Sequence, residues 1–175
     1  QIHAQTLSFM SLICWLFFQN FRSLHALQFN LPDFSFSHSS LKLTGDADFA
    51  YNKLALTQSH IDGKTDYSFG RVIYANESFQ LRDPVRGKEA DFDTHFSFNV
   101  STFSKREGGD GFAFFIAANG SGIPYKSYGG CMALISNCSY SNASGIVAVE
   151  FDTFQNEWDG SDAHLGININ SIRSA

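Results

Sequence analysis

Apolar and polar residues alternate with a period of two in several short stretches of this chain, and this pattern predicts β-strands. The longest alternation covers residues 91–100, and shorter ones cover 27–31, 41–44, 54–57, 70–74 and 79–81. Residues 111–117 are apolar throughout, which predicts a strand buried on both faces. Residues 146–154 and 165–170 form the last two predicted strands, and no helical period longer than two turns occurs after residue 26.

Turn residues separate these stretches, as in the segment that begins at Asp83 and ends at Gly87. The 175 residues include 19 Phe, 14 Gly and only three Pro, a composition that suits short strands joined by turns. A chain of this length can bury one core. The sequence therefore predicts an all-β domain, a sandwich or jelly roll of antiparallel sheets.

The N-terminus has the pattern of a targeting segment. Residues 7–18 are an apolar run that is too short to span a bilayer, and Ala26 ends a possible cleavage site. We expect a signal peptide over 1–26 and one domain over 27–175; an uncleaved anchor is the alternative.

Asn-x-Ser motifs support the same expectation of a secreted or cell-surface glycoprotein. The five acceptor candidates are Asn76, Asn99, Asn119, Asn137 and Asn142. Asn99 falls inside the predicted strand 91–100, so we expect it to be the candidate most often left unmodified.

The net charge limits the binding partners that we expect, and the cysteines depend on the redox state of the cellular compartment. The net charge is −5 and no Lys/Arg cluster exists, which argues against nucleic acid as a partner. An oxidising compartment permits a bond between Cys131 and Cys138. A continuous strand over 131–136 would hold these two residues too far apart, so the sequence leaves the disulfide open.

The segment 147–164 carries the densest candidate chemistry. Glu150 and Asp152 are two residues apart on a predicted strand, so their side chains share one face, and Asn156, Asp159 and His164 follow from a loop. Oxygen ligands suit Ca²⁺, and a carboxylate set with one imidazole suits Mn²⁺. A solvated acidic face is the ordinary alternative for the carboxylate pair.

Five motifs along the chain resemble the legume lectin (plant L-type lectin) family. They begin at Gly70 (GRVIY), Ala90 (ADFDTHFSF), Gly109 (GDGFAFF), Gly129 (GG) and Val147 (VAVEFDTF). The resemblance covers residues 27–175 and implies a concanavalin-like jelly-roll sandwich with Mn²⁺ and Ca²⁺ beneath a shallow sugar site.

The family's metal ligands can be carried over residue by residue. The resemblance implies that Glu150, Asp152, Asp159 and His164 hold Mn²⁺. It implies that Asp152, the carbonyl of Phe154, Asn156 and Asp159 hold Ca²⁺.

The same resemblance assigns sugar-binding roles to four residues. Asp110 would accept hydrogen bonds from sugar hydroxyls, Asn156 would donate through its amide, Gly130 would donate its backbone N–H, and Phe154 would cover the apolar face of the sugar. The family also implies a cis peptide bond between Gly109 and Asp110. Taken alone, Asp110 reads as a turn residue, Gly130 as a bulge and His164 as a surface histidine.

Three alternative functions follow from the same fold. A glycoside hydrolase would need a further acid where Phe154 and Gln155 stand, so we expect no catalysis. The lectin domain of a plant receptor kinase would require a membrane span after Ala175, and a defence or storage relative would have lost sugar binding. The family implies that strands of both sheets and the loop that selects the sugar follow Ala175, and that oligomers form through the back sheet.

Overall fold

The structure is a computed structural model that describes residues 26–34, 39–58, 67–83, 85–101, 109–138 and 145–175. Its regular elements are seven strands and two short 3₁₀ turns. They are β1 (Leu41–Gly45), β2 (Asp48–Ala50), β3 (Lys53–Ala55), β4 (Gly70–Tyr74), β5 (Gly111–Ala117), η1 (Gly129–Cys131), η2 (Ser136–Cys138), β6 (Ile146–Asp152) and β7 (His164–Ile169). The predicted all-β class is confirmed, and within the described residues no helix is long and apolar enough to cross a membrane.

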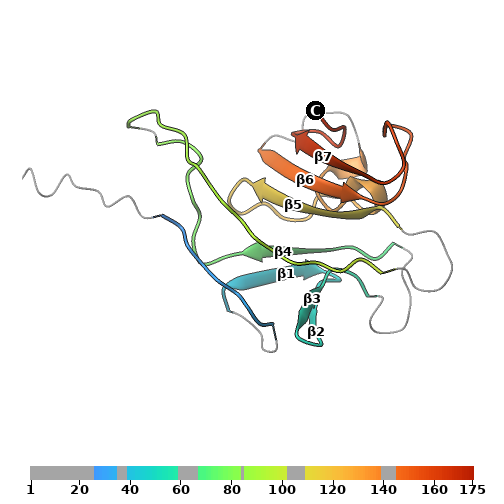
Figure 1. Cartoon of the computed structure of the whole chain (residues 1–175), viewed down its shortest axis with the longest axis horizontal. Coiled ribbons are helices and arrows are strands. Elements are labelled where there is room, and N and C mark those ends of the chain that lie inside the picture. The colour runs from blue at the N-terminus through green and yellow to red at the C-terminus, as the bar shows by residue number, and fades with distance from the viewer. Residues whose placement is uncertain (1–25, 35–38, 59–66, 84, 102–108, 139–144) are drawn as a thin grey trace, which may run out of the picture.

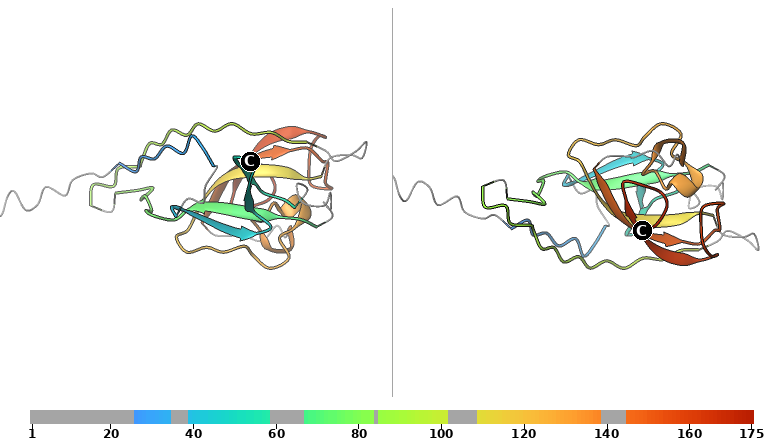
Figure 2. Two further views of the ribbon diagram at one scale, coloured as in Figure 1. Left: turned by 90° about the horizontal axis from the view of Figure 1, so that it is seen from below. Right: turned by 90° about the horizontal axis from the view of Figure 1, so that it is seen from above.

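The strands form one three-stranded sheet and two antiparallel pairs. β6 lies between β5 and β7, β1 pairs with β4, and β2 pairs with β3. The β5–β6–β7 sheet lies over the β1–β4 pair as a second layer (Figure 1), and both views of Figure 2 show the same layering. This is the two-layer sandwich that the strand pattern predicts.

Arg71 of β4 joins the two layers. Its guanidinium lies 4.2 Å from the centre of the Phe115 ring on β5 and donates a hydrogen bond of 2.5 Å to the carbonyl of Gly122. The side chain is buried. A cation over an aromatic face is attracted by the ring quadrupole, which offsets part of the cost of burying this charge.

Three predicted strands are wrong. Residues 27–31, 79–81 and 91–100 are described, but none of these stretches belongs to a sheet of the structure. Alternation favours an extended backbone, but a strand also needs a neighbour that accepts and donates its backbone hydrogen bonds. Segment 91–100 instead packs on the sheet through its side chains. The centre of the Phe98 ring lies 4.6 Å from that of Phe112 and 5.0 Å from that of Phe151.

β6 presents its polar residues inward. Glu150 and Asp152 are only 2% and 4% exposed, whereas Val149 on the opposite face is 37% exposed. The prediction that Glu150 and Asp152 share a face is confirmed. β5 is half-buried along 112–117 rather than fully buried on both faces, because its outer face is covered only in part by the rings of segment 91–100.

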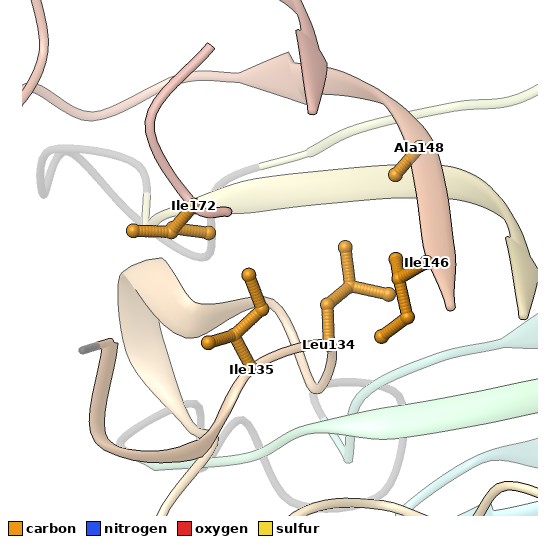
Figure 3. Close-up of a cluster of buried hydrophobic side chains, with 5 residues drawn as sticks. All are labelled: Leu134, Ile135, Ile146, Ala148 and Ile172. Atoms are coloured by element: carbon orange, nitrogen blue, oxygen red, sulfur yellow. The ribbon is translucent and has the colours of Figure 1, made fainter. Parts of the chain in front are cut away.

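The inner face of β6 is covered by two irregular segments rather than by a strand. Leu134 and Ile135 from the loop after β5 and Ile172 from the C-terminal segment form one buried cluster with Ile146 and Ala148 of β6, and Figure 3 shows Leu134 next to Ile146. Burial of three large aliphatic side chains stabilises this arrangement by about 1.5–3 kcal/mol for each. The core therefore fixes the loop that also contains Gly130.

A disulfide between Cys131 and Cys138 closes the part of this loop that follows Gly130, which we call the disulfide loop (131–138). The chain doubles back through η1 and η2, so the two Cα atoms are 4.8 Å apart, within the normal range for a disulfide. Four residues of this loop that are not glycine have positive φ: Met132, Ala133, Asn137 and Cys138. Local conformations that cost energy persist when the surroundings constrain them, and the disulfide is one such constraint.

Replacing both cysteines by serine is expected to lower the free energy of unfolding by about 2–3 kcal/mol, because the open eight-residue loop gains entropy in the unfolded chain. Thermal unfolding followed by circular dichroism should shift down by about 5–10 °C. Dithiothreitol should lower the midpoint of the wild type and leave that of the double variant unchanged. An equal response of both proteins to the reductant would contradict this role.

Candidate functional site

The candidate site lies where β6 ends and β7 begins, in the loop between them, which we call the site loop (153–163). The N-terminal ends of β4 and β5 lie at the same end of the molecule, at the right in Figure 1 and in both views of Figure 2. Antiparallel pairing sets this arrangement, since Asp152 is paired with both Gly111 and His164. Residues far apart in the sequence are thus brought to one edge of the sheet.

Asp152, Asp159 and His164 form a compact cluster. One potential ligand atom from each lies within 4.8 Å of the other two. Glu150 joins from the same face, with its Oε1 3.3 Å from Nε2 of His164. The structure therefore brings together the four residues that the sequence predicts as Mn²⁺ ligands.

The proximity of these groups and their partial burial shift the pKa values of Asp152 and His164. The pKa of Asp152 is raised to about 6, chiefly by burial. The neighbouring carboxylates of Asp159 and Glu150 also act to raise it, and the hydrogen bond from the Phe154 N–H and the charge of His164 act to lower it. The pKa of His164 is also raised, chiefly by its hydrogen bond to the carbonyl of Asp162. Carboxylates that are buried close together need a nearby positive charge if all of them are to stay ionised.

Asn156 adds an independent indication that the site fits a metal. Its Oδ1 is buried and receives no hydrogen bond from any residue that the structure describes. A buried acceptor without a donor is unfavourable unless another electropositive partner is present. Its backbone N–H donates to Asp159 Oδ2 at 2.6 Å, which holds the amide beside the carboxylate cluster.

The predicted sugar-binding residues also meet at this end of the sheet. A Cβ placed on Gly129 would lie 3.7 Å from Asp110 Oδ2, and one placed on Gly130 would lie 2.4 Å from Asn156 Oδ1. Asp110 and Asn156 therefore lie against two consecutive glycines, Gly129 and Gly130. Phe154, two residues before Asn156 in the site loop, is 40% exposed.

Thr153 connects the two halves of this region. Its hydroxyl donates to the carbonyl of Gly109 at 2.5 Å, and its N–H donates to the carbonyl of Asp110 at 3.5 Å. Asp110 is thereby held next to Asp152 of β6.

The predicted cis peptide bond between Gly109 and Asp110 is wrong, because the described chain has none. A cis bond that does not precede proline costs about 3–4 kcal/mol, and trans is the ordinary form. The position of Asp110 is set by its contacts with Thr153 instead.

Three contacts of this site were not predicted from the sequence. Thr153 anchors Asp110, Trp158 packs against Gly130, and the hydroxyl of Ser174 donates to Glu150 Oε1. Thr153 has a weak signal, since it stands between two predicted ligands. Ser174 has none, because 24 residues separate it from Glu150.

Four of the five glycosylation candidates lie at exposed positions: Asn76, Asn99, Asn119 and Asn137. Asn142 and residues 1–25 of the predicted signal peptide lie outside the described residues. The expectation that Asn99 lies in a strand is wrong, because segment 91–100 is extended but unpaired. All four remain sterically open candidates for modification.

Metal binding should weaken as the pH falls below 6. A carboxylate can bind a metal only when it is ionised, and an imidazole only when it is neutral. The pKa values of Asp152 and His164 are both raised, so protons would compete with a metal at these two residues. At pH 5, protonation of Asp152 alone should reduce the affinity by about tenfold relative to pH 7. Titrations with Ca²⁺ and Mn²⁺ at pH 5, 6 and 7 would measure this.

In the chelated protein, folding stability depends on pH in the opposite direction: it falls as the pH rises. A carboxyl group whose pKa is raised on folding binds its proton more tightly in the folded state, so its contribution to stability is lost as the pH rises from about 4 to 6. Metal affinity that is constant from pH 5 to 7 would contradict the first expectation, and a free energy of unfolding of the chelated protein that is constant from pH 4 to 6 would contradict the second.

Comparison with known proteins identifies the family. The family model for the legume lectin domain matches residues 26–175. Lectin 8 of Medicago truncatula is 40% identical over 158 residues, which cover 86% of this chain and 57% of that protein. This chain thus spans little more than half the length of the relative.

Solved structures show the same relationship. The acidic lectin of winged bean, in complex with methyl-α-D-galactose, superposes with a TM-score of 0.67 at 34% identity, over 79% of this chain and 57% of that one. Peanut lectin with a nine-residue peptide gives a TM-score of 0.69 at 31% identity, over 80% and 60%. The chain belongs to the legume lectin family and has its concanavalin-like fold.

Proposed function

We propose that this chain binds carbohydrate as a metal-dependent plant lectin and performs no catalysis. The observation that carries the proposal is the convergence of Asp110, Gly130 and Asn156 beside the cluster of Asp152, Asp159 and His164. A carboxylate, a backbone N–H and an amide provide acceptors and donors for sugar hydroxyls. Membership of the family supports this role.

The metal ions that we propose are Mn²⁺ and Ca²⁺. Glu150, Asp152, Asp159 and His164 would hold Mn²⁺, and Asp152, Asn156, Asp159 and the carbonyl of Phe154 would hold Ca²⁺. The unpartnered Oδ1 of Asn156 and the raised pKa of Asp152 support a cation here. When bound, the ions would neutralise the carboxylates and fix the amide of Asn156 for the sugar.

The chemistry of the site supports binding without bond cleavage. A retaining glycosidase needs two carboxyl groups about 5–5.5 Å apart with a free acid for protonation. Here Glu150 is buried and engaged by His164 and Ser174, and Phe154 stands where a third acid would be required. The exposed ring of Phe154 suits the apolar face of a sugar instead.

Secretion, or exposure on the outside of the plasma membrane, would supply the oxidising environment for the Cys131–Cys138 bond and for modification of the exposed asparagines. Galactosides are the first sugars to test, because the winged bean relative carries methyl-α-D-galactose.

A glycan array tests the proposal directly. The protein, expressed through a secretory pathway, should bind a subset of glycans in Ca²⁺ and Mn²⁺ and lose that binding after chelation. The variant Asp110→Asn should lose glycan binding while it still takes up both metals, because Asp110 lies outside the metal cluster. Glycan binding that survives thorough chelation, or that survives Asp110→Asn, would contradict the proposed site.

A further inference from the structure

The disulfide between Cys131 and Cys138 begins at the residue directly after Gly130, whose backbone N–H is proposed to meet the sugar. The bond therefore constrains the same stretch of backbone that supplies one side of the proposed sugar site. A bond that served stability alone could join any two neighbouring segments of the fold, so its place next to Gly130 points to a second role.

The two glycines before this bond fit closely against the groups proposed to bind sugar. A Cβ on Gly130 would lie 2.4 Å from Asn156 Oδ1 and 2.9 Å from Cζ2 of Trp158. A Cβ on Gly129 would lie 3.7 Å from Asp110 Oδ2. Hydrogen bonds weaken steeply as their geometry departs from the ideal, so a small shift of this backbone would change what the site offers to a sugar.

The backbone directly after Cys131 has a conformation that needs a constraint. Met132 and Ala133 have φ of +49° and +57°, in the left-handed region that favours glycine. In this conformation the N–H of Met132 donates to the carbonyl of Gly129 at 2.8 Å, and the N–H of Ala133 donates to the carbonyl of Ser127 at 2.7 Å. Relaxation of Met132 and Ala133 would turn these N–H groups away and release the turn that holds Gly130.

The disulfide is the covalent link between the two ends of this loop. Leu134 and Ile135 anchor the middle of the loop in the core, but they leave its ends free to separate. The two Cα atoms that the bond joins are 4.8 Å apart. Cys131 is 2% exposed whereas Cys138 is half-buried, so a reductant meets the sulfur of Cys138 first.

The metal cluster does not depend on this loop. Asp152 lies at the end of β6, His164 at the start of β7 and Asp159 in the site loop between them. Opening of the disulfide loop should therefore alter the sugar site and leave the proposed Mn²⁺ ligands in place.

We propose that the Cys131–Cys138 disulfide is a redox-sensitive positioning element of the sugar site, which holds the Gly130 N–H in place only while the bond is oxidised. This inference rests on the proposed function. A dithiol reductant would reverse it: one thiolate attacks Sγ of Cys138, forms a mixed disulfide and releases Cys131, and the second thiol then displaces Cys138. The reductant becomes a cyclic disulfide, and its two electrons and two protons end on the two cysteine thiols. Sugar binding would thus be confined to oxidising surroundings.

The test uses the full chain, expressed through a secretory pathway and loaded with Ca²⁺ and Mn²⁺, and the glycan that it binds best on an array. Half of the sample is reduced with dithiothreitol and freed of reductant without oxygen, and alkylation with mass spectrometry checks that both cysteines are free. Reduction should lower sugar affinity by about tenfold or more and leave Mn²⁺ affinity within about twofold. Oxidised glutathione should restore sugar affinity. The emission maximum of Trp158, which contacts Gly130, should shift with the loss.

Two variants serve as controls. The double variant Cys131→Ser, Cys138→Ser should have the sugar affinity of the reduced wild type and should not respond to dithiothreitol. Ile172→Val is the matched control for stability, because Ile172 packs in the same core from outside the loop. It should lower the midpoint of thermal unfolding, and keep the sugar affinity of the wild type and its response to reduction.

The outcomes separate this inference from the proposed function. Sugar affinity that is equal in the oxidised and reduced wild type would overturn the positioning role and leave the lectin proposal standing. A parallel loss of sugar and Mn²⁺ affinity on reduction would also overturn it, because the bond would then serve the fold as a whole. No glycan binding by the oxidised wild type would overturn both proposals. The reduction experiment needs no variant, so it decides the question even where the double variant does not fold.

Discussion

Replacement of Asp152 by asparagine is expected to reduce metal affinity by about 100-fold or more and to remove sugar binding with it. Asp152 is one of the two residues, with Asp159, that the proposed ion sites share, and one of its carboxylate oxygens lies within 4.8 Å of ligand atoms of both Asp159 and His164. Asparagine has the same shape but no charge. Isothermal titration with Ca²⁺ and Mn²⁺, followed by glycan binding, would measure both losses.

The fold should tolerate this change. Asp152 Oδ1 accepts from the Phe154 N–H at 2.7 Å, a hydrogen bond that an asparagine carbonyl keeps. Burial disfavours the carboxylate, as its raised pKa shows, so the chelated variant should unfold at the same temperature as the chelated wild type or a higher one. A variant that unfolds much more easily without metal would mean that Asp152 serves the fold rather than an ion.

Asp162→Asn is the matched control, because it makes the same chemical change in the same loop. Asp162 is exposed and offers His164 only its backbone carbonyl. Its metal affinity should stay within about twofold of the wild type. A comparable loss in both variants would show that general charge, and not the ligand set, controls binding.

Replacement of Gly130 by alanine is expected to weaken sugar binding by about 100-fold. The new Cβ would lie 2.4 Å from Asn156 Oδ1 and 2.9 Å from Cζ2 of Trp158, closer than real side chains approach. The amide of Asn156 must then move away from its place beside Gly130, so the site loses a donor and its geometry together. The midpoint of thermal unfolding should also fall, because overpacking costs about 1–3 kcal/mol.

Trp158 provides a direct readout of this displacement, since it is the only tryptophan after the predicted signal peptide. Its fluorescence should change in Gly130→Ala. Gly160→Ala is the matched control in the site loop: a Cβ there would meet nothing within 4 Å. Sugar affinity that is equal in the two variants would show that the close approach at Gly130 has no role in binding.

The sequence could predict much of the candidate site because its ligands follow one strand. The period of two along β6 places Glu150 and Asp152 on one face, and the short site loop must return to pair with β7, which brings His164 opposite Asp152. Asp110 and Gly130 could be assigned only through the family's motifs. Nothing local in the sequence indicates that Thr153 joins Asp110 to the end of β6.

The wrong and undecided predictions share one physical cause: each depended on contacts between residues that the local sequence does not reveal. The alternation over 91–100 favours an extended chain, but pairing depends on a neighbour that the sequence does not identify. The Cys131–Cys138 bond could not be decided because spacing alone does not show that the chain turns through η1 and η2. The trans bond at Gly109 likewise depends on what surrounds it.

By itself the sequence determined the class of fold, the strands β4 to β7 and the alternation that separates carboxylates from apolar side chains on β6. Only the tertiary structure decided which of those faces is covered. Leu134, Ile135 and Ile172 arrive from distant segments and bury the face that carries Glu150 and Asp152, while Val149 remains exposed on the other. Alternation is a local property of the backbone, but burial depends on which distant side chains pack against each face.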